Sequence, residues 1–308
     1  MSRHRIVVIG GNNVDIHATS ETQLVYGDSN PGHIHTGLGG VGRNIAENLA
    51  RIGQDVSLVT VFGDDEFSLL AQAQAERVGM DTAHSIRVTN APSCVYVCIN
   101  EPDGVMSVAV NDMELCERIT PEYLQTLLPV LNAADAVIVD ANISEAAIDT
   151  LAQHVTAPLF ADAVAAKKAG RLHRSLPRLR GLKCNQIEAE LLTGLAIAHE
   201  HDMSAAANSL HQMGLEYVLI TLGSRGAFAS DGNAQVFERP FPQRVINSTG
   251  CGDAFTAAAV VAALDHRELR ELLQLGLAAA SMCGQSANAV SEHISQAALE
   301  EYLVPRAN

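Results

Sequence analysis

The sequence contains no tryptophan, and aromatic residues make up only 4% of its 308 residues. Proteins that bind single-stranded nucleic acid stack bases on aromatic side chains, so that function is not expected. Basic residues are also scarce, because 20 Lys and Arg stand against 35 Asp and Glu, which gives a net charge of −15 at pH 7. Such a surface repels phosphate backbones and anionic lipid. We therefore expect a small substrate, with neither nucleic acid nor a membrane as a partner.

Cysteine is sparse and forms no recognisable pattern. The six cysteines include no Cys-x-x-Cys pair and lack the density of a secreted disulfide scaffold, which favours reduced thiols. No apolar run reaches the roughly 18 residues of a transmembrane helix, since the longest candidate, 254–264, stops at Asp265. The apolar run at 6–9 is too short for a signal peptide. We expect a cytoplasmic protein.

Short apolar segments alternate with segments of helical periodicity along the chain. Hydrophobic residues make up 47% of the sequence, which is enough for a large core. Residues 6–9 predict a buried strand, and 40–53 predict a helix that closes on Gly53. The alternation predicts an α/β fold with a mostly parallel central sheet and helices on both faces. Further strands and helices are expected at 56–61, 66–78, 136–139, 145–154, 159–161, 188–193, 205–213 and 217–221.

One segment interrupts this rhythm. Residues 93–100 and 105–111 alternate apolar and polar side chains around a turn that contains Asp103-Gly104, which predicts a β-hairpin. The polar, glycine-rich stretch 16–36 is expected to join it, so that about 16–36 and 93–112 form a small β lid over one end of the main sheet. No linker or repeat is visible, and we expect a single domain over 1–308. The apolar region 254–282 predicts two buried helices.

The segment 247–253, NSTGCGD, leads directly into the apolar helix expected from Ala254. Its two glycines allow a turn whose amide hydrogens point outward, and the helix adds the positive end of its dipole, so the segment predicts an anion cradle. A phosphate bound there lies near Asp253, which is then placed to accept a proton from an attacking hydroxyl. The alternative is an acidic residue that only stabilises the first turn of the helix.

Three further patterns leave two interpretations open. Residues 37–42, GLGGVG, contain the dinucleotide-binding pattern GxGxxG, but no apolar strand precedes them, which disfavours a nicotinamide site. Asn185 and Glu188 predict either oxygen ligands for Mg²⁺ held mainly through water or a capping box at a helix start. Residues 221–226, TLGSRG, predict either an approach to nucleotide phosphates through Gly223 or an ordinary hairpin turn.

Two longer segments carry a family resemblance. Residues 39–53, GGVGRNIAENLARIG, and 247–255, NSTGCGDAF, resemble the two signatures of the ribokinase-like (phosphofructokinase-B) family of carbohydrate and nucleoside kinases, in the same order. The segments KCNQIEAE and TLGSRG between them also match the order of that family, so the resemblance spans nearly the whole chain. It implies a ribokinase-like three-layer fold with a small β lid, and a kinase that uses ATP with Mg²⁺.

The resemblance also implies roles for individual residues. Asp253 takes the place of the catalytic base, and the anion hole is formed by the backbone amides of Gly250, Cys251 and Gly252. The residues that match the ribose-hydroxyl binders are Asp15, Gly39, Gly40 and Asn44, with Asn12 as a neighbouring candidate. The residues that match the ATP site are Asn185, Thr221, Gly223 and Gly226, and Glu188 matches the glutamate associated with Mg²⁺.

Shorter matches narrow the resemblance to one branch of the family. Residues 28–32 (DSNPG), 108–114 (VAVNDME) and 140–148 (DANISEAAI) are similar to the branch that phosphorylates pseudouridine. There, Asn111 and Asp112 at the end of the hairpin are the expected contacts to the base. Two positions depart from the family pattern. Asn247-Ser248 replaces a common Asp-Thr, which leaves open whether a monovalent cation is bound, and Cys251 replaces Ala or Gly.

The expected function is ATP-dependent phosphorylation of the 5′-hydroxyl of pseudouridine to pseudouridine 5′-phosphate. The chain lacks a Walker A motif, which excludes a P-loop kinase. The alternatives are another nucleoside such as uridine, inosine or cytidine, a free sugar such as ribose and, more remotely, a nicotinamide-dependent oxidoreductase or a non-catalytic sensor. Because the hairpin offers a free strand edge, we expect a homodimer formed through the lid.

Overall fold

The computed structural model describes residues 1–303. At its centre lies an eight-stranded sheet in the order β14-β13-β12-β11-β10-β9-β1-β4. The strands from β12 to β4 run parallel, and β13 and β14 add an antiparallel edge. These strands are β1 (Arg5–Ile9), β4 (Asp55–Val59), β9 (Ala136–Asp140), β10 (Leu159–Asp162), β11 (Gly181–Asn185), β12 (Tyr217–Thr221), β13 (Ala227–Ser230) and β14 (Gln235–Glu238).

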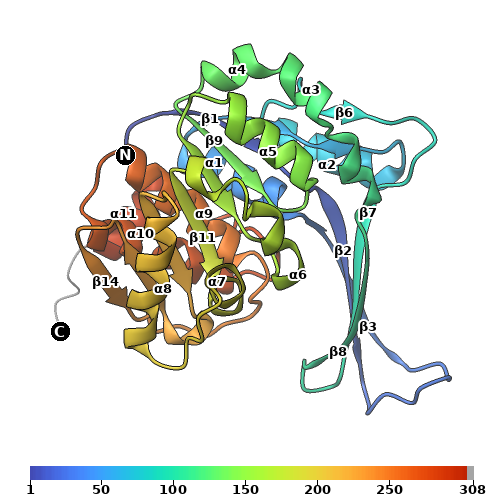
Figure 1. Cartoon of the computed structure of the whole chain (residues 1–308). Helices are drawn as coiled ribbons and strands as arrows, with labels where there is room; N and C mark the ends of the chain where they lie inside the picture. The colour runs from blue at the N-terminus through green and yellow to red at the C-terminus, as the bar shows by residue number, and fades with distance from the viewer. Residues whose placement is uncertain (304–308) are drawn as a thin grey trace.

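Helices cover both faces of this central sheet (Figure 1). They are α1 (Val41–Ile52), α2 (Glu66–Arg77), α3 (Pro121–Thr126), α4 (Leu128–Asn132), α5 (Glu145–His154), α6 (Ala166–Ala169), α7 (Gln186–Thr193), α8 (Glu200–Gln212), α9 (Cys251–Leu264), α10 (Leu269–Gly284) and α11 (Gln296–Leu303). Side chains of β1 alternate between two cores, since Val7 and Ile9 enter one and Ile6 and Val8 the other. The first core includes α3, α5, α7 and α8, and the second includes α1, α9 and α10.

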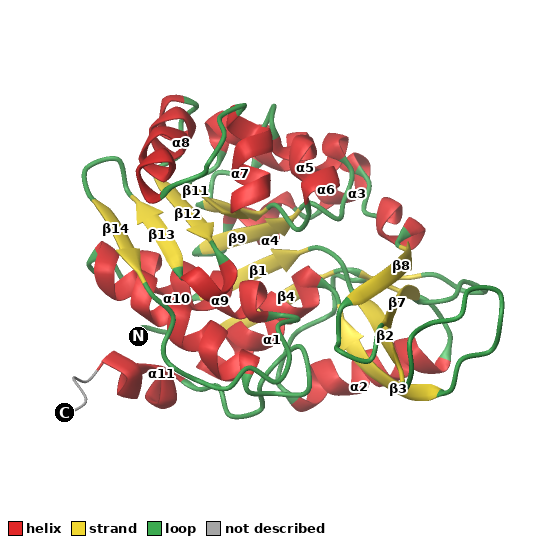
Figure 2. Cartoon of the chain, turned by 90° about the horizontal axis from the view of Figure 1, so that it is seen from below, coloured by secondary structure: helices red, strands yellow, loops and turns green. Residues whose placement is uncertain are grey.

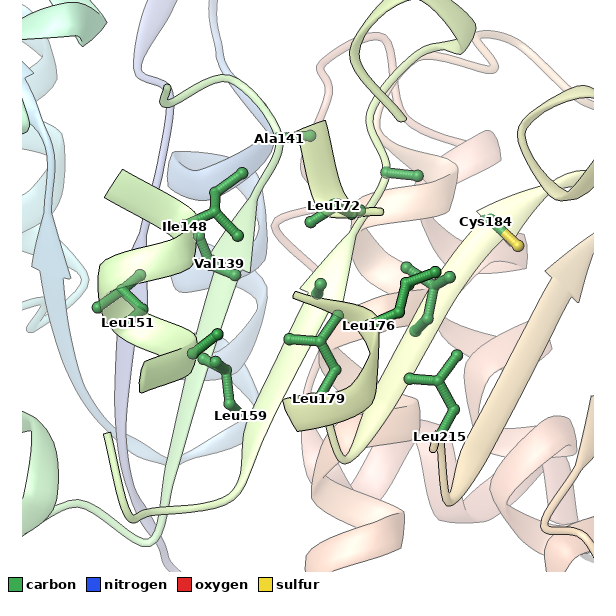
Figure 3. Close-up of a cluster of buried hydrophobic side chains, with 14 of the residues drawn as sticks. Val139, Ala141, Ile148, Leu151, Leu159, Leu172, Leu176, Leu179, Cys184 and Leu215 are labelled. Atoms are coloured by element: carbon green, nitrogen blue, oxygen red, sulfur yellow. The ribbon is translucent and has the colours of Figure 1, made fainter. Parts of the chain in front are cut away.

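The first core explains why the central strands are apolar throughout. Figure 3 shows Ile148 and Leu151 of α5 beside Val139 and Leu159 of the neighbouring strands β9 and β10. All four side chains are at most 3% exposed. Because helices cover each strand from both sides, the usual alternation of apolar and polar residues is replaced by continuous apolar runs. The predicted α/β architecture is confirmed.

A second sheet of four strands, the small sheet, stands away from the central sheet (Figure 2). Its order is β3-β2-β7-β8, with β2 (Asn13–Ser20), β3 (Gly32–Gly39), β7 (Cys94–Asn100) and β8 (Met106–Asp112). Strands β7 and β8 form the hairpin predicted from the sequence. The stretch 16–36 does supply β2 and β3, but these strands start at Asn13 and end at Gly39. Their polar and glycine-rich sequence hides the period-two pattern that marks a strand.

Other boundaries shift by a few residues. The strand predicted over 56–61 ends at Val59, and β5 (Val61–Phe62) pairs instead with β6 (Ile86–Arg87). The apolar region near the carboxyl end forms α9 and α10 as predicted, separated by residues 265–268. Within residues 1–303, no helix is long and apolar enough to cross a membrane.

Candidate active site

The start of α9 is a half-buried turn at Gly250, Cys251 and Gly252. Gly250 is the N-cap residue with φ of +80°, and a Cβ there would collide with the carbonyl oxygen of Ala289, so this position requires glycine. The amide of Cys251 makes only a long contact of 3.4 Å with the Ser248 oxygen. Because the first amides of a helix have no acceptor within the helix, this loop presents N–H groups at the positive end of a 14-residue helix.

A groove of about 640 Å³ opens beside this loop. It is lined by Thr221, Gly223 and Gly226 from the end of β12 and the following turn, and by Cys251 and Gly252 from α9. The turn joins the antiparallel strands β12 and β13, so the hairpin interpretation is confirmed, and the same turn also borders the groove. The groove lies within the size range of small-molecule sites.

Asn185 and Glu188 form the capping box that was one of their two interpretations. The Glu188 oxygens accept hydrogen bonds from the backbone and side-chain nitrogens of Asn185, each at 2.7 Å. Burial raises the pKa of Glu188, against the effect of Lys183. Each carboxylate oxygen keeps a further lone pair, which fits Mg²⁺ held through water rather than directly. Within the described residues, no group of three or more His, Cys, Asp or Glu is arranged to hold a metal ion.

Asp253 joins the two signature segments. It lies in the first turn of α9, is 7% exposed, and its Oδ2 accepts a hydrogen bond of 2.7 Å from Nδ2 of Asn44 on α1. Burial and then the negative charge of Asp162 raise the pKa of Asp253 to about 7, although Lys183 and Asn44 act in the opposite direction. A carboxylate with a pKa near neutrality is well suited to accept a proton from a hydroxyl.

The residues expected to bind ribose lie together where β2, β3 and α1 meet. A Cβ at Gly39 would collide with the carboxylate of Asp15, and a Cβ at Gly40 would strike the backbone of Gly11 and Asn12. Asp15 is 9% exposed, and burial raises its pKa. The Oδ1 atom of Asn12 is buried and has no hydrogen-bond partner among the described residues. This oxygen is therefore an acceptor available to a ligand hydroxyl.

The structure adds Asp140, which sequence analysis did not identify as a site residue. Asp140 ends β9 and is fully buried. Its Oδ2 accepts N–H groups from Gly11 at 2.9 Å and Gly42 at 2.7 Å, and its Oδ1 accepts the amide of Asn142 at 2.9 Å. Asp140 thus holds both glycine segments beside the residues that are expected to bind the sugar. Its position after an apolar strand was the available signal, because functional residues gather at the carboxyl ends of parallel strands.

The register of the small sheet separates the two residues expected to contact a base. Asp15 pairs with Tyr96, and Tyr96 pairs with Asn111, so these three share one face. Two strand spacings place Asn111 about 10 Å from Asp15. Asp112 pairs with Val95 and lies on the other face, where its carboxylate accepts the Glu114 amide at 3.2 Å. Only Asn111 faces the same side as Asp15.

The side chains of Asn247 and Cys283 donate hydrogen bonds to the backbone of residues 287–289. Asn247 Nδ2 donates to the Ala287 oxygen at 3.1 Å, and the Cys283 thiol donates to the Ala289 oxygen at 3.2 Å. Asn247 therefore brings an N–H donor and no negative charge to this junction. An uncharged residue at this position attracts a monovalent cation less strongly than a carboxylate would.

The model of the pfkB family of carbohydrate kinases matches residues 3–295. The chain belongs to this family. A pseudouridine kinase from Escherichia coli (strain K12) is 34% identical, over 90% of this chain and 89% of its own length. A carbohydrate kinase from Agrobacterium tumefaciens is 30% identical, with a TM-score of 0.82 over 97% of both chains. Ribokinase from Arabidopsis thaliana, complexed with ribose and ATP, has the same fold, with a TM-score of 0.87, 24% identity and coverage of 99% of this chain and 100% of its own.

Membership of the pfkB family makes this protein a phosphotransferase with an alcohol acceptor, a sugar or nucleoside kinase. The predicted family and the ribokinase-like fold are confirmed. The nicotinamide interpretation of residues 37–42 is excluded, because these residues end β3, a strand of the small sheet, and lead into α1 of a pfkB kinase.

Proposed function

We propose that this kinase transfers the γ-phosphoryl group of ATP to the 5′-hydroxyl of pseudouridine and releases pseudouridine 5′-phosphate. One observation carries the proposal. Asn44, one of the residues expected to bind the sugar, donates a hydrogen bond to Asp253, and Asp253 directly follows Gly252, which lines the groove. The 34% identity to a pseudouridine kinase supports the choice of acceptor.

The ribose of the acceptor is proposed to lie against Asn12, Asp15 and Asn44. The unpartnered oxygen of Asn12 and the carboxylate of Asp15 are acceptors for sugar hydroxyls. Because Gly39 and Gly40 have no side chain, Asp15 and the backbone of Gly11 and Asn12 pack directly against them, which keeps these proposed sugar contacts close together. This arrangement points the 5′-hydroxyl toward Asp253.

The base is proposed to extend along the small sheet toward Asn111. Pseudouridine carries adjacent N–H and C=O groups on its ring, and a side-chain amide offers both a donor and an acceptor to such an edge. Asn111 is exposed and shares the face of Asp15. In this proposal the small sheet determines the selectivity for the base, whereas the sugar is bound at the end of the sheet that contains Asp15.

In the proposed reaction, Asp253 accepts the proton of the 5′-hydroxyl while the hydroxyl oxygen bonds to the γ-phosphorus and the bond from phosphorus to ADP breaks. The amides of Gly250, Cys251 and Gly252 donate to the phosphoryl oxygens. Asn185, Thr221, Gly223 and Gly226 border the rest of the nucleotide. Mg²⁺, held through water near Glu188, would supply positive charge to the phosphates.

We further propose that residues 1–308 act as one kinase domain, with the small sheet as its lid, and that two copies pair through this lid. The face opposite Asp15 exposes apolar side chains, with Ile34 73%, Val108 44% and Val110 68% exposed. Strand β8 also ends the sheet with a free edge. Pairing of two lids would remove this apolar surface from water.

An ADP-release assay across pseudouridine, uridine, inosine, cytidine and ribose tests the acceptor. We expect kcat/KM for pseudouridine to exceed that of each other compound about tenfold or more. A larger value for another acceptor would replace pseudouridine while the kinase assignment stands. A chain of confirmed fold that releases no ADP with any of the five would contradict the proposed acceptor class.

A further inference from the structure

Lys183 lies next to the anion cradle formed by residues 247–253. The sequence pattern around Lys183 does not predict this position. It is on β11, within the central sheet, and is only 9% exposed. The Cβ that alanine would add at Gly252 lies 2.8 Å from its Nζ. Gly252 itself lines the nucleotide groove. The ammonium group is therefore beside the backbone donors at the start of α9, and the missing side chain of Gly252 leaves room for it.

Asp162 holds this ammonium in place. The Nζ atom lies 3.3 Å from Oδ2 and 3.5 Å from Oδ1 of Asp162, which is fully buried at the end of β10. Thr256 on α9 donates to the same Oδ2 at 2.8 Å and to the Gly252 oxygen at 3.0 Å. These contacts connect Lys183 through Asp162 to Thr256, and so to the first turn of α9.

The ammonium retains capacity for an anion. An ammonium group has three N–H donors, and within residues 1–303 its hydrogen bonds all go to Asp162. The ammonium forms an ion pair with the Asp162 carboxylate, at 3.3 Å from Oδ2. A buried charge with free donors beside a phosphate groove is an arrangement for binding an anion.

The charge balance of the site requires such a cation. Burial raises the pKa of Asp253, and the negative charges of Asp162 and Asp140 raise it further. Glu188 also faces Lys183. A triphosphate that enters this cluster adds further negative charge at short range, where the low dielectric of the interior strengthens repulsion. Lys183 offsets this repulsion at the point where Gly252 meets the groove.

We propose that Lys183 is a catalytic residue whose ammonium hydrogen-bonds the phosphoryl group during its transfer. The oxygen of the acceptor bonds to phosphorus, the bond from phosphorus to ADP breaks, the proton of the hydroxyl passes to Asp253, and Lys183 keeps its own proton throughout. The charge of Lys183 lowers the cost of negative charge on the phosphoryl oxygens. The inference rests on the phosphoryl transfer common to the family and is independent of which acceptor is used.

The test replaces the charge while keeping the volume. Lys183→Met is expected to lower kcat about 10²–10³-fold, the loss typical of one donor to a developing anion. The affinity for Mg·ADP, which lacks the γ-phosphate, is expected to stay within about threefold, whereas the affinity for a non-hydrolysable ATP analogue falls about tenfold. Lys183→Arg restores part of kcat because it restores the charge. Lys167→Met, on the exposed side of α6, is the matched control and leaves kcat unchanged.

Removal of Lys183 also leaves Asp162 as an unpaired buried charge, which destabilises the fold. The double variant Asp162→Asn with Lys183→Met removes both charges, so that a folded protein without the ammonium can be assayed if the single variant unfolds. A merely structural role predicts that ADP and the ATP analogue lose affinity equally, in step with thermal stability. That result, or a folded double variant with kcat within about threefold of the parent, would overturn the proposal.

Discussion

The two halves of the site are built in opposite ways. On the phosphate side, Asp162, Lys183 and Asp253 are buried against the central sheet and connected by protein contacts. On the side proposed to hold the base, Asn111 is exposed on the small sheet, and the opposite face of that sheet exposes apolar side chains. A fixed, buried cluster suits a chemical step that every family member shares, because preorganised charge stabilises a transition state. An exposed sheet suits recognition that changes with the acceptor.

The largest effect is expected at Asp253. Asp253→Asn keeps the volume but cannot take up the hydroxyl proton, so kcat falls about 10²–10⁴-fold while nucleotide binding is largely spared. Steady-state kinetics and calorimetric titration with Mg·ADP measure the two quantities. Asp55→Asn, at an exposed carboxylate, is the control and keeps full activity. Near-normal turnover in Asp253→Asn would remove the proposed base.

The same carboxylate predicts a dependence on pH. Because burial and Asp162 raise the pKa of Asp253 to about 7, the base is protonated in acid and inactive. We expect kcat/KM to fall as pH decreases below about 7, roughly tenfold per pH unit, and to level off above it. Initial rates measured from about pH 5.5 to 9 with saturating Mg·ATP reveal this limb. A midpoint near the ordinary value for aspartate would contradict the assignment of this group.

The small sheet provides the next test. Asn111→Ala removes one hydrogen-bonding group from the base side, so the preference for pseudouridine over uridine falls about tenfold while the rate with ribose stays unchanged. Asp112→Ala is the matched control, since its carboxylate lies on the other face. Competition assays with the two nucleosides measure the preference. An unchanged preference in Asn111→Ala would separate Asn111 from base recognition.

A moderate effect is expected from the apolar face of the small sheet. The double variant Ile34→Asp and Val110→Asp places charges where two lids are proposed to meet, so sedimentation velocity is expected to show a monomer in place of a dimer. The KM for the acceptor rises a few-fold, since an unpaired lid closes less firmly. Leu70→Asp, at an exposed apolar position on α2, is the control. A parent protein that is already monomeric would refute the dimer.

The smallest effect concerns monovalent cations. Because Asn247 and Cys283 already bridge the loops near α9, replacing K⁺ by tetramethylammonium at constant ionic strength is expected to change kcat by less than about twofold. Thermal unfolding with and without K⁺ gives a second readout and is expected to show no shift. Asn247→Asp supplies a carboxylate and is expected to create a response to K⁺. A large loss of kcat in the parent protein when K⁺ is replaced would contradict this expectation.

Local sequence was sufficient to predict those candidate site residues that lie within one loop or at the start of one helix. In the segment 247–253, the glycines predict the turn and the apolar run that follows predicts the helix. The capping box at Asn185 is predicted by the spacing between Asn185 and Glu188. The contact between Asn44 and Asp253 was not predicted, because 209 residues separate them; the family resemblance assigned each residue a role but not this hydrogen bond.

Lys183 and Asp140 were not predictable in the same way. Each lies on a strand of ordinary composition, and its role arises only from the order of strands, which brings β9, β10 and β11 together beneath α9. Strand order depends on long-range packing that no short segment encodes. The separation of Asn111 from Asp112 likewise depends on the register of β7 with β8, since a shift by one residue exchanges the faces.

One buried oxygen controls how the small sheet can move. Oδ2 of Asp140 receives N–H groups from Gly11, just before β2, and from Gly42, just after β3. The segment that enters β2 and the segment that leaves β3 are therefore both held by the side chain of Asp140. Any swing of the pair pivots there, so its far tip travels much further than Asp15. We therefore expect a ligand held at the outer end of the strand pair to change its angle more than a ligand held beside Asp15 would.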